Sequence, residues 1–140
     1  MIRRKSRELC LQILFQKEFN SKFDLADSIN YFKIHHQAKA EITDYANYLA
    51  GGVLNKSDEI DALINSNSNN WKTSRMSSVD LNILRMAVFE AVLADEINAP
   101  KVVINEALEI AKKYSSSDAS SFINGILDHV IKTESQSLSE

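Results

Sequence analysis

The stretch Ser78-Val-Asp-Leu-Asn-Ile-Leu-Arg-Met-Ala-Val-Phe-Glu-Ala-Val-Leu-Ala94 decides the fold class of this chain. Its apolar residues occupy nearly the whole circumference of a helix, and neither Gly nor Pro interrupts it for about four and a half turns. A helix that is apolar on every side has to be enclosed by other helices. Ser77 and Asp80 together form a capping signal. We therefore predict an all-α domain around a central helix that runs from about Ser78 to Asp95.

Arg85 interrupts this apolar stretch. A guanidinium group inside a protein is costly unless it meets a carboxylate, so we expect a structural ion pair between two helices. The candidate partners are Glu90, Glu106 and Asp128. A binding role for Arg85 is the alternative.

The composition of the 140 residues restricts the class of protein further. Three Gly and one Pro are too few for a fold with many tight turns, and the single cysteine, Cys10, excludes an intrachain disulfide and is expected in the core. No secretory signal and no apolar run of about 18 residues is present. We expect a single domain in the reducing cytoplasm, with no membrane partner.

Helical periodicity predicts six more helices, for seven in all. A polar connector at residues 65–70 divides the single domain 1–140 into an N-terminal half, 1–64, and a C-terminal half, 71–132, followed by a frayed tail, 133–140. Gly51 and Gly52 predict close helix packing or a bend, and Gly125 predicts a close approach of another helix. The six helices are expected at about 6–19, 24–32, 41–54, 57–64, 100–114 and 117–131.

Charge is segregated along the chain. The first 17 residues hold five basic residues and one acidic residue, whereas the remaining 123 hold eleven basic and eighteen acidic residues. A basic end on an acidic body is typical of a protein whose basic end binds a polyanion such as RNA. The alternative is an ordinary solvated basic tail.

No pattern of catalytic residues is present. The sequence has no glycine-rich phosphate loop, nucleophile elbow or metal-ligand spacing. The adjacent His35 and His36 would point about 100° apart on a helix, which disfavours joint chelation of a metal. We therefore expect no catalytic residue, no metal and no cofactor.

Four segments resemble the NusB family of bacterial transcription antitermination factors: Pro100–Tyr114, Ser117–Asp128, Val79–Glu90 and Arg7–Phe15. The resemblance covers nearly the whole chain. It implies about seven helices in two roughly perpendicular bundles and no enzymatic activity. It also implies binding to single-stranded boxA RNA of ribosomal RNA operon leaders, as a heterodimer with the ribosomal protein NusE. The setting it implies is the transcription elongation complex, which contains RNA polymerase and other Nus factors.

The resemblance also implies site residues. A partner surface for NusE is implied at Phe15, Glu18 and Asp80. The basic start is short and Ser121 stands where the family often has a basic residue, which implies weak RNA affinity without the partner. Phe15 stands where a tyrosine is frequent and lacks the hydroxyl that could reach RNA or the partner. Ser117 is expected to cap the last helix, whose free backbone amides at this end could bind a phosphate. The spacing of Phe122 suits both core packing and stacking on an unpaired base. The implied RNA surface comprises Arg3, Arg4, Lys5, Arg7, Ser117, Asp118, Ser121 and Phe122.

Two other functions are compatible with the sequence. One is a helical protein-interaction domain with a merely solvated basic tail. The other is an RNA-recognition domain related to that of ribosomal RNA cytosine methyltransferases. For that class we expect a catalytic domain after the helices, and the sequence through Glu140 carries none.

Overall fold

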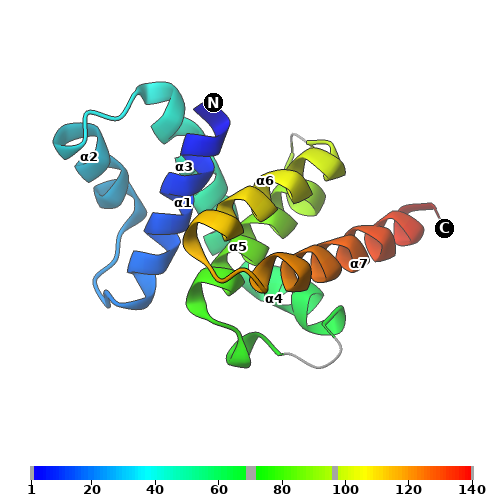
Figure 1. Cartoon of the computed structure of the whole chain (residues 1–140). Helices are drawn as coiled ribbons and strands as arrows, with labels where there is room; N and C mark the ends of the chain where they lie inside the picture. The colour runs from blue at the N-terminus through cyan, green and yellow to red at the C-terminus, as the bar shows by residue number, and fades with distance from the viewer. Residues whose placement is uncertain (1, 69–71, 96–97, 140) are drawn as a thin grey trace.

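The computed structural model describes residues 2–68, 72–95 and 98–139, and within these ranges every regular element is helical (Figure 1). The prediction of an all-α protein with seven α-helices is confirmed. In Figure 1, α1 to α3 form one group, and α6 and α7 cross it at a steep angle. The elements are α1 (Ile2–Glu18), α2 (Leu25–His35), α3 (Ala40–Asn55), α4 (Ser57–Ser66), η1 (Thr73–Arg75), α5 (Ser78–Val88), η2 (Phe89–Leu93), α6 (Pro100–Tyr114) and α7 (Ala119–Ser139).

Several predicted helix ends agree with the structure. Asp24 caps α2 by accepting a hydrogen bond of 3.0 Å from the Asp27 amide, and Pro100 is the first residue of α6. α7 continues to Ser139, past the predicted start of the frayed tail at 133, because residues 133–139 contain neither Gly nor Pro. α4, assigned to the N-terminal half, contacts α5 and α7 as well as α3. The division of the chain into two halves therefore stays a prediction.

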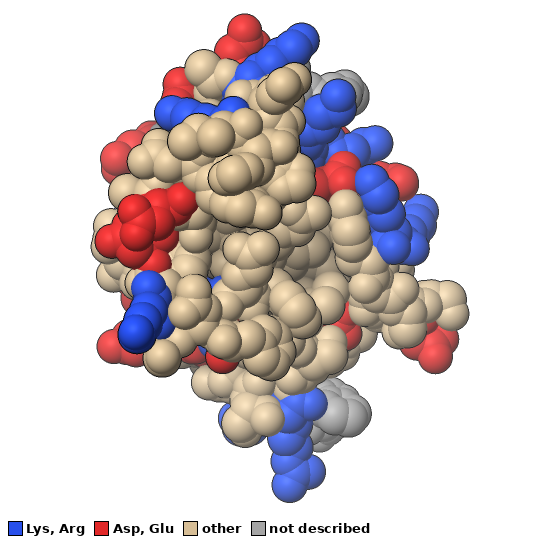
Figure 2. Space-filling model, turned by 90° about the vertical axis from the view of Figure 1, so that its left-hand side faces the viewer, with Lys and Arg blue, Asp and Glu red and all other residues tan. Residues whose placement is uncertain are grey.

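Charged side chains are unevenly distributed over the surface. Figure 2 looks onto the left-hand side of Figure 1, where α2 and α1 lie. Lys and Arg side chains gather at its upper right, toward the end of the molecule where the chain begins, with acidic side chains among them. A broad uncharged surface occupies the centre of this face.

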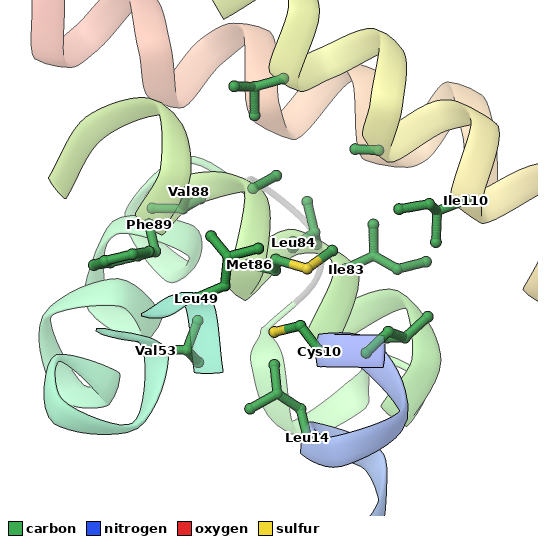
Figure 3. Packing of buried hydrophobic residues seen from close by; sticks show 14 of the residues in the cluster. Cys10, Leu14, Leu49, Val53, Ile83, Leu84, Met86, Val88, Phe89 and Ile110 are labelled. Atoms are coloured by element: carbon green, nitrogen blue, oxygen red, sulfur yellow. The ribbon is translucent and has the colours of Figure 1, made fainter. Parts of the chain in front are cut away.

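α5 is the central helix, as predicted. It begins at Ser78, and the Ser77 hydroxyl accepts a hydrogen bond of 3.2 Å from the Asp80 amide. It contacts α1, α3, α4, α6 and α7, and its side chains form the middle of the apolar core (Figure 3). Cys10 is fully buried in this core, as predicted, and burial raises the pKa of its thiol.

The central helix does not stay α-helical to Asp95. From Phe89 to Leu93 it forms a π-helical turn, closed by a hydrogen bond of 2.8 Å from the Ala94 amide to the Phe89 carbonyl. Glu90 lies in this widened turn and is buried. Periodicity could not reveal this change, because four of the five residues in the turn are apolar and no polar face distinguishes an α-turn from a π-turn.

The two glycine predictions have opposite outcomes. α3 continues to Asn55, and a Cβ atom at Gly52 would overlap the ring of Phe89, so close packing is confirmed at this site. The prediction for Gly125 was wrong. A Cβ atom there would have no neighbour within 4 Å, because this side of α7 faces open space.

The predicted partners of Arg85 were also wrong. Its Nε and Nη2 donate hydrogen bonds of 2.9 and 3.0 Å to the carboxylate of Asp61 on α4. The three expected carboxylates bind other cations: Glu90 pairs with Arg7, Glu106 with Arg4 and Asp128 with Lys132. Periodicity indicates which face of a helix is buried, but not which neighbouring helix a polar side chain meets.

No described helix is long and apolar enough to cross a membrane.

Candidate nucleic-acid interface

The basic residues at the start of the chain lie on the first turns of α1 and do not form a tail ahead of it. Arg3 and Lys5 are exposed, and the side chain of Arg4 is 39 % exposed. The first turn carries no acidic residue, so these cations oppose the positive end of the helix dipole. This placement costs helix stability and provides a cationic surface.

Arg4 is held against α6. Its Nε donates to Glu106 at 2.7 Å and its Nη2 to the other carboxylate oxygen at 3.1 Å. The hydrogen bond and charge of Arg4 keep the pKa of the Glu106 carboxyl below its ordinary value. The pair fixes the start of α1 to the middle of α6 and leaves part of the guanidinium at the surface.

Arg7 does not reach the surface. Its Nε and Nη2 donate to the Glu90 carboxylate at 2.8 and 2.5 Å, with the two side chains 4 % and 1 % exposed. Burial alone would lower the pKa of Arg7. The hydrogen bond and the charge of Glu90 raise this pKa by more than burial lowers it, so the net pKa lies above its ordinary value. The surface role implied for Arg7 is incompatible with this position. The residue anchors α1 from inside.

Two further groups complete the site around Glu90. The Tyr45 hydroxyl donates to Glu90 at 2.6 Å, and the Asn98 amide donates to Glu90 and to Tyr45, each at 3.1 Å. Burial and the hydrogen bond to Glu90 raise the pKa of Tyr45 to about 12. Asn98 in turn accepts a hydrogen bond of 3.0 Å from Arg3, whose guanidinium lies 4.3 Å from the centre of the Tyr45 ring. Arg3 is thereby oriented by the buried network.

The carboxyl end of α6 lies beside the second turn of α1. Lys113 and the Tyr114 hydroxyl both donate to the Glu8 carboxylate, at 2.8 and 2.6 Å. Burial raises the pKa of Glu8, but the hydrogen bonds from Lys113 and Tyr114 outweigh it, so the net pKa is lowered. Glu8 therefore stays ionised at neutral pH and holds Lys113 in place.

The turn into α7 differs from its prediction. α7 begins at Ala119, so Asp118, not Ser117, immediately precedes the helix. Ser117, Asp118 and Ser121 are exposed, as a contact surface requires. The predicted cap at Ser117 was wrong because Ser117 and Asp118 together form a turn ahead of the helix.

Phe122 combines both roles considered for it. Its ring is partly buried and packs against the apolar core. The same residue lines an open pocket of about 270 Å³ together with Asp118, Arg75 and Asp80. Core packing therefore does not remove Phe122 from the surface.

The three residues implied for partner binding lie around the start of α5. The Glu18 carboxylate accepts hydrogen bonds from the Ser78 hydroxyl and, at 3.1 Å, from Asn82. Asp80 accepts a hydrogen bond of 2.5 Å from Ser115, in the turn after α6. Phe15 is 38 % exposed, and its ring centre lies 5.0 Å from that of Phe19. Because Asp80 and Phe122 line one pocket, the implied RNA and partner surfaces adjoin.

The buried role of Arg7, which the prediction missed, has a signal in the spacing of nearby residues. Arg7 precedes Leu11 by four residues and Leu14 by seven, which places it on the apolar face of its helix. No comparable signal marks Asn98 or Tyr45. Among the described residues, no group of three or more His, Cys, Asp or Glu side chains is arranged to hold a metal ion.

Comparison with known proteins gives consistent matches. A family model described as NusB family matches residues 4–132. The transcription antitermination protein NusB of Bdellovibrio bacteriovorus is 42 % identical over 130 residues, covering 93 % of this chain and 95 % of that protein. The structure of T. maritima NusB superposes with a TM-score of 0.82 at 33 % identity, covering 93 % and 90 % of the two chains.

A third match concerns the fold. The crystal structure of the antitermination factors NusB and NusE in complex with dsRNA contains a chain with a TM-score of 0.82 and 22 % identity. The match covers 94 % of this chain and 97 % of that one.

Proposed function

This chain belongs to the NusB family, and we propose that it is a non-enzymatic transcription antitermination factor that binds boxA-type RNA of ribosomal RNA operon leaders together with NusE. The observation that carries this proposal is the exposed basic start of α1 on a protein with a net charge of −3. The site of action is the cytoplasmic elongation complex, with RNA polymerase and other Nus factors.

RNA binding at the start of α1 is electrostatic. Arg3 and Lys5 are exposed, and the stack of Arg3 on Tyr45 holds its guanidinium in one orientation before RNA arrives. Each phosphate that such a cation neutralises releases a counterion, so the affinity falls as salt is added. The acidic remainder of the chain limits attachment of RNA elsewhere.

The start of α7 provides the second part of the RNA surface. A single strand exposes its bases, which stack on aromatic side chains. Phe122 lines an open pocket next to Asp118, whose carboxylate can accept a hydrogen bond from a base edge. Ser117 and Ser121 supply neutral hydrogen-bonding groups on either side.

Replacing Arg3 and Lys5 by Ala tests the electrostatic part. We expect weaker binding of boxA-type RNA by the complex with NusE, and a salt slope reduced by about 1.4 for two lost phosphate contacts on a single strand. Arg4 is left in place, because its bond to Glu106 is structural. Fluorescence anisotropy at several salt concentrations measures both quantities.

The control for this experiment is Lys22→Ala with Lys132→Ala. This pair removes the same charge from the connection after α1 and from α7. It should leave the salt slope near the wild-type value. Equal effects of the two double variants would show that net charge, and not the start of α1, governs binding, and an unchanged slope in the first would refute the contact.

Replacing Asp80 by Lys tests the partner surface. Reversal of this charge beside Glu18 is expected to weaken NusE binding at least tenfold, or about 1.4 kcal/mol, while RNA binding by the free protein changes less. Titration calorimetry with NusE measures the effect. Ser115→Ala is the control, because it removes the hydrogen bond to Asp80 but keeps the carboxylate. An intact heterodimer in the Asp80→Lys variant would exclude Asp80 from the interface.

A further inference from the structure

Two lysines at the end of α6 lie between the two parts of the proposed RNA surface. Lys112 and Lys113 have side chains that are 62 % and 61 % exposed. Neither belongs to the residues that the family resemblance implies for RNA binding. Their position relative to α1 and α7 is fixed by contacts that can be followed one by one.

α1 and α6 are joined by side-chain contacts that occur in the same order along both helices. Arg3 contacts Asn98, just ahead of α6, Arg4 contacts Glu106, and the next turn of α1 places Glu8 against Lys113. A residue later in α1 therefore contacts a residue later in α6. The basic start of α1 is followed, along this shared surface, by the lysines at the end of α6.

The lysines continue into the start of α7. Only four positions separate Lys113 from Ser117, and the bond between Ser115 and Asp80 fixes the turn that joins them. A strand of RNA that passes from the start of α1 to Phe122 along α6 crosses this end of the helix.

The acidic groups on this surface are engaged in holding the basic ones. Glu106 binds Arg4, Glu8 binds Lys113, and Glu109 lies 3.4 Å from Lys112. The strip contains five basic side chains and these three carboxylates, so it is positive on a chain whose net charge is −3. It consists of Arg3, Arg4, Lys5, Lys112 and Lys113 with Glu8, Glu106 and Glu109.

We propose that Lys112 and Lys113 contact backbone phosphates of the bound RNA and join the start of α1 to the start of α7 in one continuous path. This inference rests on the proposed RNA-binding function. Lysines in the last turn also interact favourably with the negative end of the helix dipole. That interaction affects stability, whereas a phosphate contact affects the salt dependence of binding.

The test is a double variant, Lys112→Ala with Lys113→Ala, titrated with boxA-type RNA in the presence of NusE. We expect the affinity near 0.1 M salt to fall roughly threefold to tenfold and the salt slope to fall by about 1.4. Lys112→Arg with Lys113→Arg should retain both values. Lys22→Ala with Lys132→Ala is again the charge-matched control and should leave the slope unchanged.

The outcomes separate this inference from the proposed function. If Arg3→Ala with Lys5→Ala weakens binding but the α6 variant does not, the path along α6 is wrong and the basic start of α1 stands. If neither variant weakens binding, the proposed electrostatic surface fails as a whole. A lower affinity with an unchanged salt slope would also overturn the phosphate contact.

Discussion

Replacing Glu90 by Gln is expected to destabilise the protein by about 3–5 kcal/mol, because it leaves the Arg7 guanidinium buried without an opposite charge. Glu90 and Arg7 are among the least exposed side chains in the described part of the chain, and water cannot replace the lost carboxylate. Gln keeps the shape of Glu, so the loss reports charge and hydrogen bonding and not packing. Urea unfolding followed by circular dichroism measures the change in the free energy of unfolding.

Glu106→Gln is the matched control. It breaks the second arginine–glutamate pair on α1, in which the glutamate is buried but the arginine side chain is 39 % exposed. Solvent screens that pair, so the loss of stability should be much smaller. A loss below about 1 kcal/mol in Glu90→Gln, or equal losses in the two variants, would show that the buried pair does not anchor α1.

Replacing Gly52 by Ala is expected to destabilise the protein by about 1–3 kcal/mol. Ala is the better helix former by about 1 kcal/mol, so propensity alone predicts the opposite sign. The loss is expected because the added methyl group overlaps the Phe89 ring. This ring is buried, and Phe89 is the residue directly after α5. Urea unfolding of the two proteins gives the difference.

Two companion variants test this explanation. Gly125→Ala, where the added methyl group meets open space, should stabilise the protein by about 0.5–1 kcal/mol. In a Phe89→Leu background, Gly52→Ala should lose much of its penalty, because the smaller side chain no longer fills the same space. A penalty that is unaffected by Phe89→Leu would rule out the ring as its cause.

Much of the fold could be predicted from the sequence, because it depends on local signals. Apolar periodicity predicted the helices, and Ser77, Asp24 and Pro100 marked where three of them begin. These signals act within one or two turns of a helix. They contain no information about the rotation of one helix against another, which decides that Arg85 meets Asp61.

The candidate site could be predicted less well from the sequence, because it too depends on how the helices pack against one another. The charge of the basic start is visible in the sequence, and the spacing of Arg7 from the apolar residues indicates that it is buried. Only the packed structure shows that the carboxylate it meets belongs to Glu90. The role proposed for Lys112 and Lys113 depends on which residues of α1 and α6 meet, and no local pattern in the sequence indicates this. Residues distant in the sequence are brought together there by packing.

The pairing of α1 with residues 90 to 113 constrains the order of events during protein synthesis. The ribosome releases α1 first, yet Arg7 has to wait for Glu90 and Arg4 for Glu106, more than 80 positions later. Until α6 emerges, the nascent N-terminus lacks the carboxylates that fix its shape. The proposed RNA-binding end is therefore completed late although it is translated first, so a chain without α6 lacks the finished form of this surface.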